Sequence, residues 1–324
     1  MHETMIDLHA FFSQQLPLWP LAQANYNNLK QALIKDVYLS DFERIRLVCL
    51  PARIASSSAK ITAKGEVDRP CFLCSHRLPA EQQHLDFDHC DILVNPFPVF
   101  EEHFTVPSKK HQDQSLLDEW PSFYRLLQEI PQDYVVFFNG ACCGASAPDH
   151  LHFQIGLKDV MPLQMDTFAP ENLLFIKHYE NCSLYALQHY HRQACLLRAS
   201  KNATQENVLG VIKLFLQAFA SICHLDDAEK HINVVAWKEG SEYLLLIFPR
   251  AAHRPQCFYS EDEKQRMITS PASVEMMGYY IFPRAEDFHK ADAAALKAIY
   301  RDVCLSQEVM SQLFALLLID NESK

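Results

Sequence analysis

The stretch from Asn139 to Gln154 reads NGACCGASAPDHLHFQ and carries more chemical information than any other part of the sequence. If its end forms a strand, side chains alternate between two faces, so that His150, His152 and Gln154 share one face. The apolar side chains between them then face the core. The glycines and the serine upstream allow tight turns that expose backbone N–H groups. The stretch therefore predicts a phosphate cradle beside a row of polar side chains.

A neutral imidazole in such a row can attack phosphorus when one ring nitrogen is free and the other is held as a hydrogen-bond donor. His152, in the middle of the row, is the predicted nucleophile. We expect Gln154 to donate to a phosphoryl oxygen, and Ser146 and the N–H groups around Gly144 to stabilise the charge on the other oxygens. The alternative is a half-buried strand whose histidines are satisfied core residues. Three polar groups on one face, after a loop with glycine and serine, favour the site.

The pattern at 150–154 resembles the His-φ-His-φ-Gln signature of the nucleotidyltransferase branch of the histidine-triad superfamily. This branch contains galactose-1-phosphate uridylyltransferases, dinucleoside tetraphosphate phosphorylases and GDP-hexose phosphorylases. Asn139, Gly144 and Ser146 resemble the Asn…Gly-x-Ser approach to that signature. In this chain the serine stands one residue further from the first histidine than in the family pattern.

Two further segments resemble the same branch. Residues 94–107 resemble its nucleoside-side hairpin, and residues 270–288 resemble the late motif of GDP-hexose phosphorylases. The resemblance implies that His152 attacks the α-phosphorus of a nucleoside diphosphate compound and forms a covalent nucleotidyl-histidine, from which a second phosphate-bearing acceptor takes the nucleotide. It also implies a set of nucleotide-binding residues: Arg53, Asn95, Asn139 and Gly144.

Cys71 and Cys74 are separated by two residues, the spacing at which two thiolates can reach one tetrahedral metal ion. The resemblance to uridylyltransferases nominates His111 and His150 as the other two ligands. The predicted cofactor is one structural zinc ion, which would join three segments and fix His150, and through it the register of His152. Two ordinary buried thiols are the alternative.

The length of 324 residues suggests two domains of about 150 residues each. We expect a helical lead-in over residues 1–44, where helical spacing continues to about residue 40, a catalytic lobe over 45–165 and a degenerate second lobe over 166–324. Each half shows paired strand patterns flanked by helical ones. Together with the resemblance, this predicts an α+β fold of two tandem histidine-triad-like lobes, each an antiparallel sheet flanked by helices. The predicted strands are 134–138, 150–157, 232–237 and 243–249, and the predicted helices are 115–130, 205–223 and 291–318.

Composition excludes several classes of protein. Forty acidic residues against 29 basic ones give a net charge of −11, which disfavours binding to nucleic acid. The longest apolar run, 313–319, has seven residues, well below the ~20 that cross a bilayer, and the start lacks the pattern of a secretory signal. Eleven cysteines then indicate thiols in a reducing compartment. We expect a cytoplasmic protein without nucleic-acid or membrane partners.

The predicted function is that of a nucleotidyltransferase or phosphorylase. Its expected substrate is a nucleotide sugar or a dinucleoside polyphosphate, its acceptor is phosphate or a sugar phosphate, and we also consider a homodimer. The alternative is a non-catalytic nucleotide-binding or regulatory protein on the same scaffold. The shifted position of Ser146 and the segment 175–228, which matches no motif, motivate that alternative.

Overall fold

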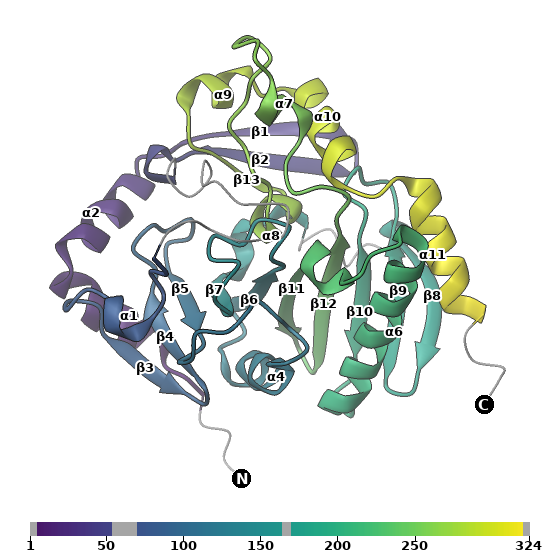
Figure 1. The fold of residues 1–324 in the computed structure, drawn as a ribbon, viewed down its shortest axis with the longest axis horizontal. Helices are drawn as coiled ribbons and strands as arrows, with labels where there is room; N and C mark the ends of the chain where they lie inside the picture. Colours follow the sequence, from purple (N-terminus) through teal and green to yellow (C-terminus); the bar gives the residue numbers. More distant parts are fainter. Residues whose placement is uncertain (1–4, 54–69, 164–169, 320–324) are drawn as a thin grey trace.

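The protein is described by a computed structural model over residues 5–53, 70–163 and 170–319 (Figure 1). One ten-stranded sheet lies at its centre, in the order β3-β4-β5-β7-β6-β11-β12-β10-β9-β8. Neighbouring strands in it are all antiparallel. The first half of the chain contributes β3 (His84–Phe87), β4 (Cys90–Val94), β5 (His103–Pro107), β6 (Tyr134–Asn139) and β7 (His152–Leu157). The second half contributes β8 (Leu173–Tyr179), β9 (Cys182–Leu187), β10 (Cys195–Ala199), β11 (Ile232–Glu239) and β12 (Glu242–Pro249).

The two sets of five strands have the same arrangement. From one edge of the sheet inward the strands are β3, β4, β5, β7 and β6, and from the other edge inward they are β8, β9, β10, β12 and β11. In both halves the fifth strand of the sequence therefore lies between the third and the fourth. A helix connects the third strand to the fourth in both halves, α4 (Trp120–Glu129) in the first and α6 (Gln205–Cys223) in the second. The fourth strands, β6 and β11, pair at the centre, where Asn139 lies opposite Asn233. The prediction of two tandem lobes in an α+β fold is therefore confirmed.

The lobes differ where their fourth strand connects to their fifth. In the first lobe, residues 140–151 form a loop between β6 and β7, whereas β11 and β12 are joined by a hairpin turn at Gly240 and Ser241. Gly240 has a φ of +58°, a conformation that suits a tight turn and favours glycine. Only the first lobe thus carries a long loop at this position.

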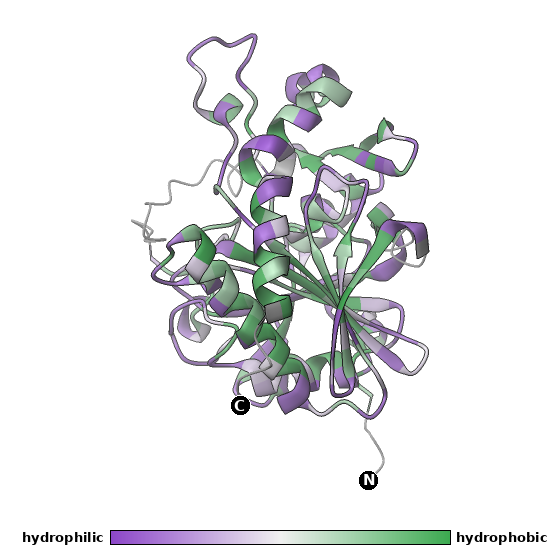
Figure 2. Cartoon of the chain, turned by 90° about the vertical axis from the view of Figure 1, so that its right-hand side faces the viewer, coloured by the Kyte–Doolittle hydropathy of each residue, from purple (hydrophilic) through white to green (hydrophobic). Residues whose placement is uncertain are grey.

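Two layers cover the sheet. On one face lie α1 (Leu8–Gln15), α2 (Pro20–Leu29), α4, α6 and α11 (Gln307–Ile319). On the other face lie α7 (Gln256–Tyr259), α8 (Ser273–Met276), α9 (Ala285–Lys290), α10 (Ala293–Val303) and a three-stranded sheet of β1 (Leu33–Ser40), β2 (Glu43–Cys49) and β13 (Tyr279–Phe282). Figure 2 shows hydrophobic residues concentrated in the twisted strands and on the helix faces turned toward them. β13 pairs with β2 in parallel, and this pairing joins the second half of the chain to the first at another place.

Several sequence-based expectations need correction. The helical lead-in is right for α1 and α2 but wrong for Leu33–Ser40, which form β1 paired with β2. The backbone hydrogen bonds of this hairpin, together with the β-forming residues Val37 and Tyr38, outweigh a helical spacing of leucines. The helix predicted over 291–318 is two helices, because α10 ends at Val303 and Cys304 pairs with Arg250 instead. The expected lobe boundary at 165/166 lies outside the described residues.

Helix α6 is the only described helix whose length and composition would suit a membrane span. Its apolar residues Val208, Ile212, Phe215 and Phe219 are fully buried in the core over the sheet, and α11 packs beside it. In this structure it serves as a core helix.

Candidate functional site

Strand β7 carries two of the predicted catalytic side chains. Phe153 and Ile155 point into the core that the helices cover, so His152 and Gln154 share the opposite face, as expected. Since β7 begins at His152, the first histidine of the row, His150, lies in the preceding loop and not on the strand. The row of three is therefore split into two side chains on the strand and one beside it.

The hydrogen bonds of His152 fix which ring nitrogen carries the proton. Its Nδ1 lies 2.8 Å from the carbonyl oxygen of His150, and only an N–H can donate to a carbonyl. Nε2 therefore carries the lone pair, and this buried atom has no hydrogen-bond partner among the described residues. Burial lowers the pKa of His152 to about 4, so the ring is neutral at neutral pH. A neutral imidazole with one nitrogen locked as donor is the state that nucleophilic attack requires.

Gln114 holds the backbone of His152 from both sides. Its Oε1 accepts the N–H of His152 at 2.8 Å, and its Nε2 donates to the carbonyl oxygens of His152 and Asn139 at 3.0 and 2.9 Å. The side chain thereby joins the ends of β6 and β7. Sequence analysis did not identify Gln114, because a residue that binds only backbone groups leaves no recognisable motif.

A cavity opens on the face of the sheet that carries Gln154. Its lining comes from both lobes: Arg53, Val99, His103, Phe137, Asn139, Gly144, Ala145, Ser146, Gln154, His253, Arg254, Ser270, Ala272, Val274, Glu275 and Ile281. Of the predicted catalytic and nucleotide-binding residues, the cavity brings together Gln154, Ser146, Arg53, Asn139 and Gly144. His152 is 2% exposed and is not among the lining residues, although Gln154 on the same face of β7 is.

Asn95 does not reach the cavity lining. Its amide donates to the hydroxyl of Thr105 at 2.9 Å, and its side-chain oxygen accepts the N–H of Phe97 at 2.9 Å. These two bonds shape the turn between β4 and β5. In this structure the side chain of Asn95 holds a turn, and its role at a nucleotide stays a prediction.

The orientation of Gln154 is set by His103, a residue that was not among the predicted site residues. His103 Nδ1 accepts the N–H of Val99 at 3.3 Å, so its Nε2–H donates to Oε1 of Gln154 at 3.0 Å. Burial lowers the pKa of His103 to about 3, which keeps it neutral. Because the oxygen of Gln154 is engaged, its NH₂ group remains to donate into the cavity. The position of His103 within the segment 94–107 was the only signal in the sequence.

The loop after β6 is held against the second lobe. Asn139 Oδ1 accepts hydrogen bonds from Asn233 Nδ2 at 2.8 Å and from the N–H and hydroxyl of Ser273 at 2.8 and 2.7 Å. Gly144 has a φ of +98°, and any Cβ there would clash with the side chain of Ala272. Asn139 and Gly144 thus place the cradle loop, and Gly144 cannot be replaced without strain.

Glu275 lies within residues 270–288, the segment that resembles the late motif, and it also lines the cavity. Its Oε2 accepts the N–H of Ala272 at 2.9 Å. Burial raises its pKa to about 7, although nearby Arg53 acts in the opposite direction. Arg53 itself donates to the carbonyl oxygen of Phe97 at 3.0 Å. The cavity therefore has one arginine and one carboxyl at this wall, with the carboxyl close to half protonated at neutral pH.

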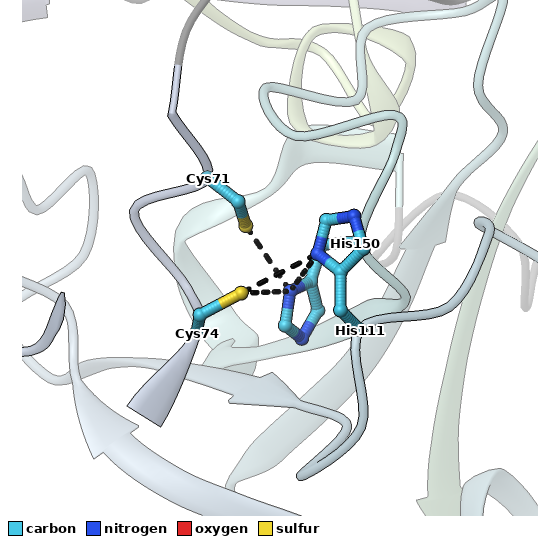
Figure 3. Close-up of side chains that lie close together, drawn as sticks. All are labelled: Cys71, Cys74, His111 and His150. Carbon is cyan, nitrogen blue, oxygen red and sulfur yellow. Dashed lines mark hydrogen bonds between the residues drawn. The ribbon is translucent and has the colours of Figure 1, made fainter. Parts of the chain in front are cut away.

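Four predicted metal ligands meet in one cluster beneath the loop (Figure 3). His150 Nδ1 lies 3.1 Å from Cys71 Sγ, 3.7 Å from Cys74 Sγ and 3.3 Å from His111 Nδ1, and Cys74 Sγ lies 3.4 Å from His111 Nδ1. In a tetrahedral zinc site with bonds of roughly 2.0 Å to nitrogen and 2.3 Å to sulfur, ligand atoms lie about 3.3–3.8 Å apart. The donor set and its spacing therefore fit zinc.

The outer side of the cluster fits a metal as well. His150 Nε2 lies 2.8 Å from the carbonyl oxygen of Ser108, to which it donates, so its Nδ1 is left unprotonated and turned toward the thiols. The Nε2 of His111 lies 4.0 Å from a carboxylate oxygen of Asp149. Zinc-binding histidines commonly have such partners on their second nitrogen. The carbonyl of the same His150 accepts from His152, so the cluster is connected to the reactive ring through one residue.

Comparison with known proteins agrees with this architecture. Residues 11–157 match the family described as Domain of unknown function (DUF4922), and residues 166–320 match the family described as GDPGP1-like, C-terminal domain. No curated protein matches the chain in sequence.

Two solved structures of yeast Ap4A phosphorylase Apa2 share the fold. One is 14% identical, covers 89% of this chain and 97% of its own, and has a TM-score of 0.57. The other, in complex with Ap4A, is 13% identical, covers 88% and 96%, and has a TM-score of 0.54. The likeness therefore extends over both lobes.

Proposed function

Because the chain belongs to the nucleotidyltransferase branch of the histidine-triad superfamily, we propose that it transfers a nucleotide through a covalent intermediate on His152. The substrate is a nucleotide sugar or a dinucleoside polyphosphate, and the acceptor is phosphate or a sugar phosphate. The GDPGP1-like match and the fold shared with a protein crystallised with Ap4A and AMP support a nucleotide as the ligand. The proposed compartment is the cytoplasm.

The observation that carries this proposal is the unpartnered Nε2 of His152. In the first step its lone pair attacks the α-phosphorus, the N–P bond forms, and the bond to the bridging oxygen breaks, so that a phosphorylated group leaves with the electron pair. Nδ1 keeps its proton and its bond to the carbonyl of His150. In the second step an oxygen of the acceptor phosphate attacks the same phosphorus and the N–P bond breaks. No proton has to move at Nε2.

The remaining predicted catalytic residues have supporting roles in this proposal. The NH₂ of Gln154 and the hydroxyl of Ser146, which both border the cavity, donate to the oxygens of the transferred phosphoryl group. Arg53 binds the nucleotide from the same cavity. Since His152 is 2% exposed, substrate binding has to uncover Nε2, and the cradle loop directly before β7 is the nearest segment in sequence.

Cys71, Cys74, His111 and His150 are the proposed zinc ligands. A bound zinc ion would supply no chemistry to the phosphoryl transfer but would hold three segments together. The carbonyl of His150 would thereby be fixed at the distance that orients His152.

Intact-mass measurement tests the proposal directly. After incubation with nucleotide sugars and dinucleoside polyphosphates at mildly alkaline pH, we expect the mass of one nucleotidyl group on the protein, and none on His152→Ala. His89→Ala, an exposed histidine on the turn between β3 and β4, serves as the control and keeps the adduct. Acid must be avoided because a phosphoramidate is acid-labile. No adduct with any of these compounds would overturn the catalytic proposal.

A regulatory nucleotide-binding protein is the second candidate. It is favoured by the burial of His152 and by the shifted Ser146. In that case nucleotide binding would be equally tight in His152→Ala, and no turnover would be found with any acceptor.

A further inference from the structure

The proposed chemistry leaves one wall of the cavity without a role. His253 and Arg254 follow β12, and Ser270 lies in the segment before α8, so all three come from the second lobe. Arg254 is 8% exposed, and it lies in the same cavity as Gln154 and Ser146. None of these three residues belongs to the predicted catalytic or nucleotide-binding set.

The hydrogen bonds of these residues join them at the wall of the cavity. The N–H of Gly144 lies 3.3 Å from Nδ1 of His253, and Nε2 of the same ring lies 3.3 Å from Ser270 Oγ. Arg254 Nε–H donates to the same oxygen at 3.4 Å. Ser270 Oγ thus connects His253 and Arg254, and all three side chains border the cavity.

The charge of the cavity is positive in a protein with a net charge of −11. Arg53 and Arg254 line it, and the one carboxyl there, Glu275, has a pKa raised to about 7 by burial. Burial also lowers the pKa of both arginines, which means that their charge is poorly solvated. The guanidinium of Arg254 lies 4.1 Å from the centroid of the Phe258 ring, which holds its plane. An anion would offset the cost of burying these charges.

We propose that Arg254, Ser270 and His253 form a phosphate subsite that binds a phosphate dianion, either free orthophosphate or the phosphate group of a sugar phosphate. Arg254 supplies charge and donors in a planar fork, Ser270 supplies its hydroxyl group, and the ring of His253 holds that hydroxyl in place. The position of the subsite in the reaction rests on the proposed function. It holds the phosphate that leaves in the first step and the acceptor in the second.

Phosphate binding to the full chain is the first test. Calorimetric titration with inorganic phosphate should show binding to the wild-type protein that is weakened tenfold or more in Arg254→Gln. Arg301→Gln, an exposed arginine on α10, should bind phosphate as the wild type does. Ser270→Ala removes only one hydroxyl group and should weaken phosphate binding several-fold. This variant keeps the test possible if Arg254→Gln does not fold. Unchanged affinity in both variants, or no phosphate binding by the wild type, would overturn the subsite.

The arms of the experiment separate this inference from the proposed function. Competition between glucose 1-phosphate and inorganic phosphate shows whether a phosphate monoester occupies the same subsite. If phosphate binding depends on Arg254 but no adduct forms on His152, the subsite stands and the catalytic proposal fails. If the adduct forms and the KM for phosphate is the same in Arg254→Gln, the subsite is wrong and the catalytic proposal stands.

Discussion

At the scale of single residues, the site is built by side chains that hold other groups in place. Gln114 binds three backbone groups around His152, and His103 fixes the amide of Gln154. Each is buried, so each of these bonds is made away from water. Losing one partner leaves a buried polar group unsatisfied, which costs more than the bond itself contributes.

Gln114→Ala should therefore lower the free energy of unfolding by about 1–3 kcal/mol, because three buried backbone groups lose their partner. It should also slow formation of the adduct on His152, since the ring is positioned through its backbone. Urea unfolding and the time course of adduct mass measure the two effects. Gln112→Ala removes a side chain of the same type two residues away, whose amide binds only Glu119, and should change neither.

Glu275 gives the protein a defined pH dependence. Burial raises its pKa from the ordinary value of 4.5 to about 7, so the folded state holds this proton more tightly than the unfolded state does. The contribution of Glu275 to the stability of the folded state is therefore most favourable below pH 4.5 and declines as the pH rises to about 7.

The wild type should lose stability between pH 5 and pH 8 as Glu275 ionises, whereas Glu275→Gln has no proton to lose there. The free energy of unfolding of Glu275→Gln, relative to that of the wild type, should therefore be higher at pH 8 than at pH 5 by on the order of 1–3 kcal/mol. Urea unfolding at the two pH values measures this difference. Glu308→Gln, an exposed glutamate on α11, should show the same difference at both pH values. If Glu275→Gln differed from the wild type by the same free energy at both pH values, the raised pKa of Glu275 would be contradicted.

At the scale of elements, the Cys–His cluster connects segments that the sheet does not. Cys71 and Cys74 precede β3, His111 follows β5, and His150 precedes β7. Each segment is a loop, so a bound ion would replace regular secondary structure in holding them together.

We expect about one zinc per chain in purified protein and none in Cys71→Ser. The variant should unfold several kcal/mol more easily, as is typical when a structural zinc is lost. Cys223→Ser, a half-buried thiol on α6, is the matched control and should keep its zinc. Elemental analysis and thermal unfolding measure both quantities, and wild-type protein without metal would remove the zinc assignment.

At the scale of the whole molecule, the two lobes share one sheet and a second junction between β2 and β13. Where the lobes meet, Asn233 and Ser273 both donate to Oδ1 of Asn139. No described residue in this contact is exposed, and the core under each lobe continues into the next. The lobes are therefore expected to unfold together.

Unfolding followed by far-UV circular dichroism and by tryptophan fluorescence should give coincident transitions, because Trp120 reports on the first lobe and Trp237 on the second. Ser273→Ala should lower the stability of that single transition by about 1–2 kcal/mol. Ser311→Ala, whose hydroxyl binds only a helix carbonyl on α11, should have little effect. Two separate transitions would show that the lobes are independent.

Much of the fold was predictable from local patterns. The helix at 205–223 and the strands around 134–138 and 243–249 were identified nearly to their bounds, since strong periodicity arises from one buried face. The strands β8, β9 and β10 were missed, as was the strand character of β1. β1 and β8 pair with the next strand across a short turn, but both are largely exposed, so no strong apolar pattern marks them. β10 pairs with the distant strand β12, which a short window of sequence does not contain.

The sequence by itself contained the residues of the proposed chemistry: a histidine, a glutamine and a serine near a glycine, and two cysteines spaced for a metal. Local geometry was enough for this, because alternation along a strand and the freedom of glycine act over a few residues. Only the tertiary structure decided that Gln114 and His103 position the site and that Arg254 and Glu275 share its cavity. It also showed that the side chain of Asn95 holds the turn between β4 and β5. The reason is physical: Gln114 and His103 bind groups from separate segments of the first lobe, and Arg254 and Glu275 reach the cavity from the second lobe, so no local pattern of sequence contains these contacts.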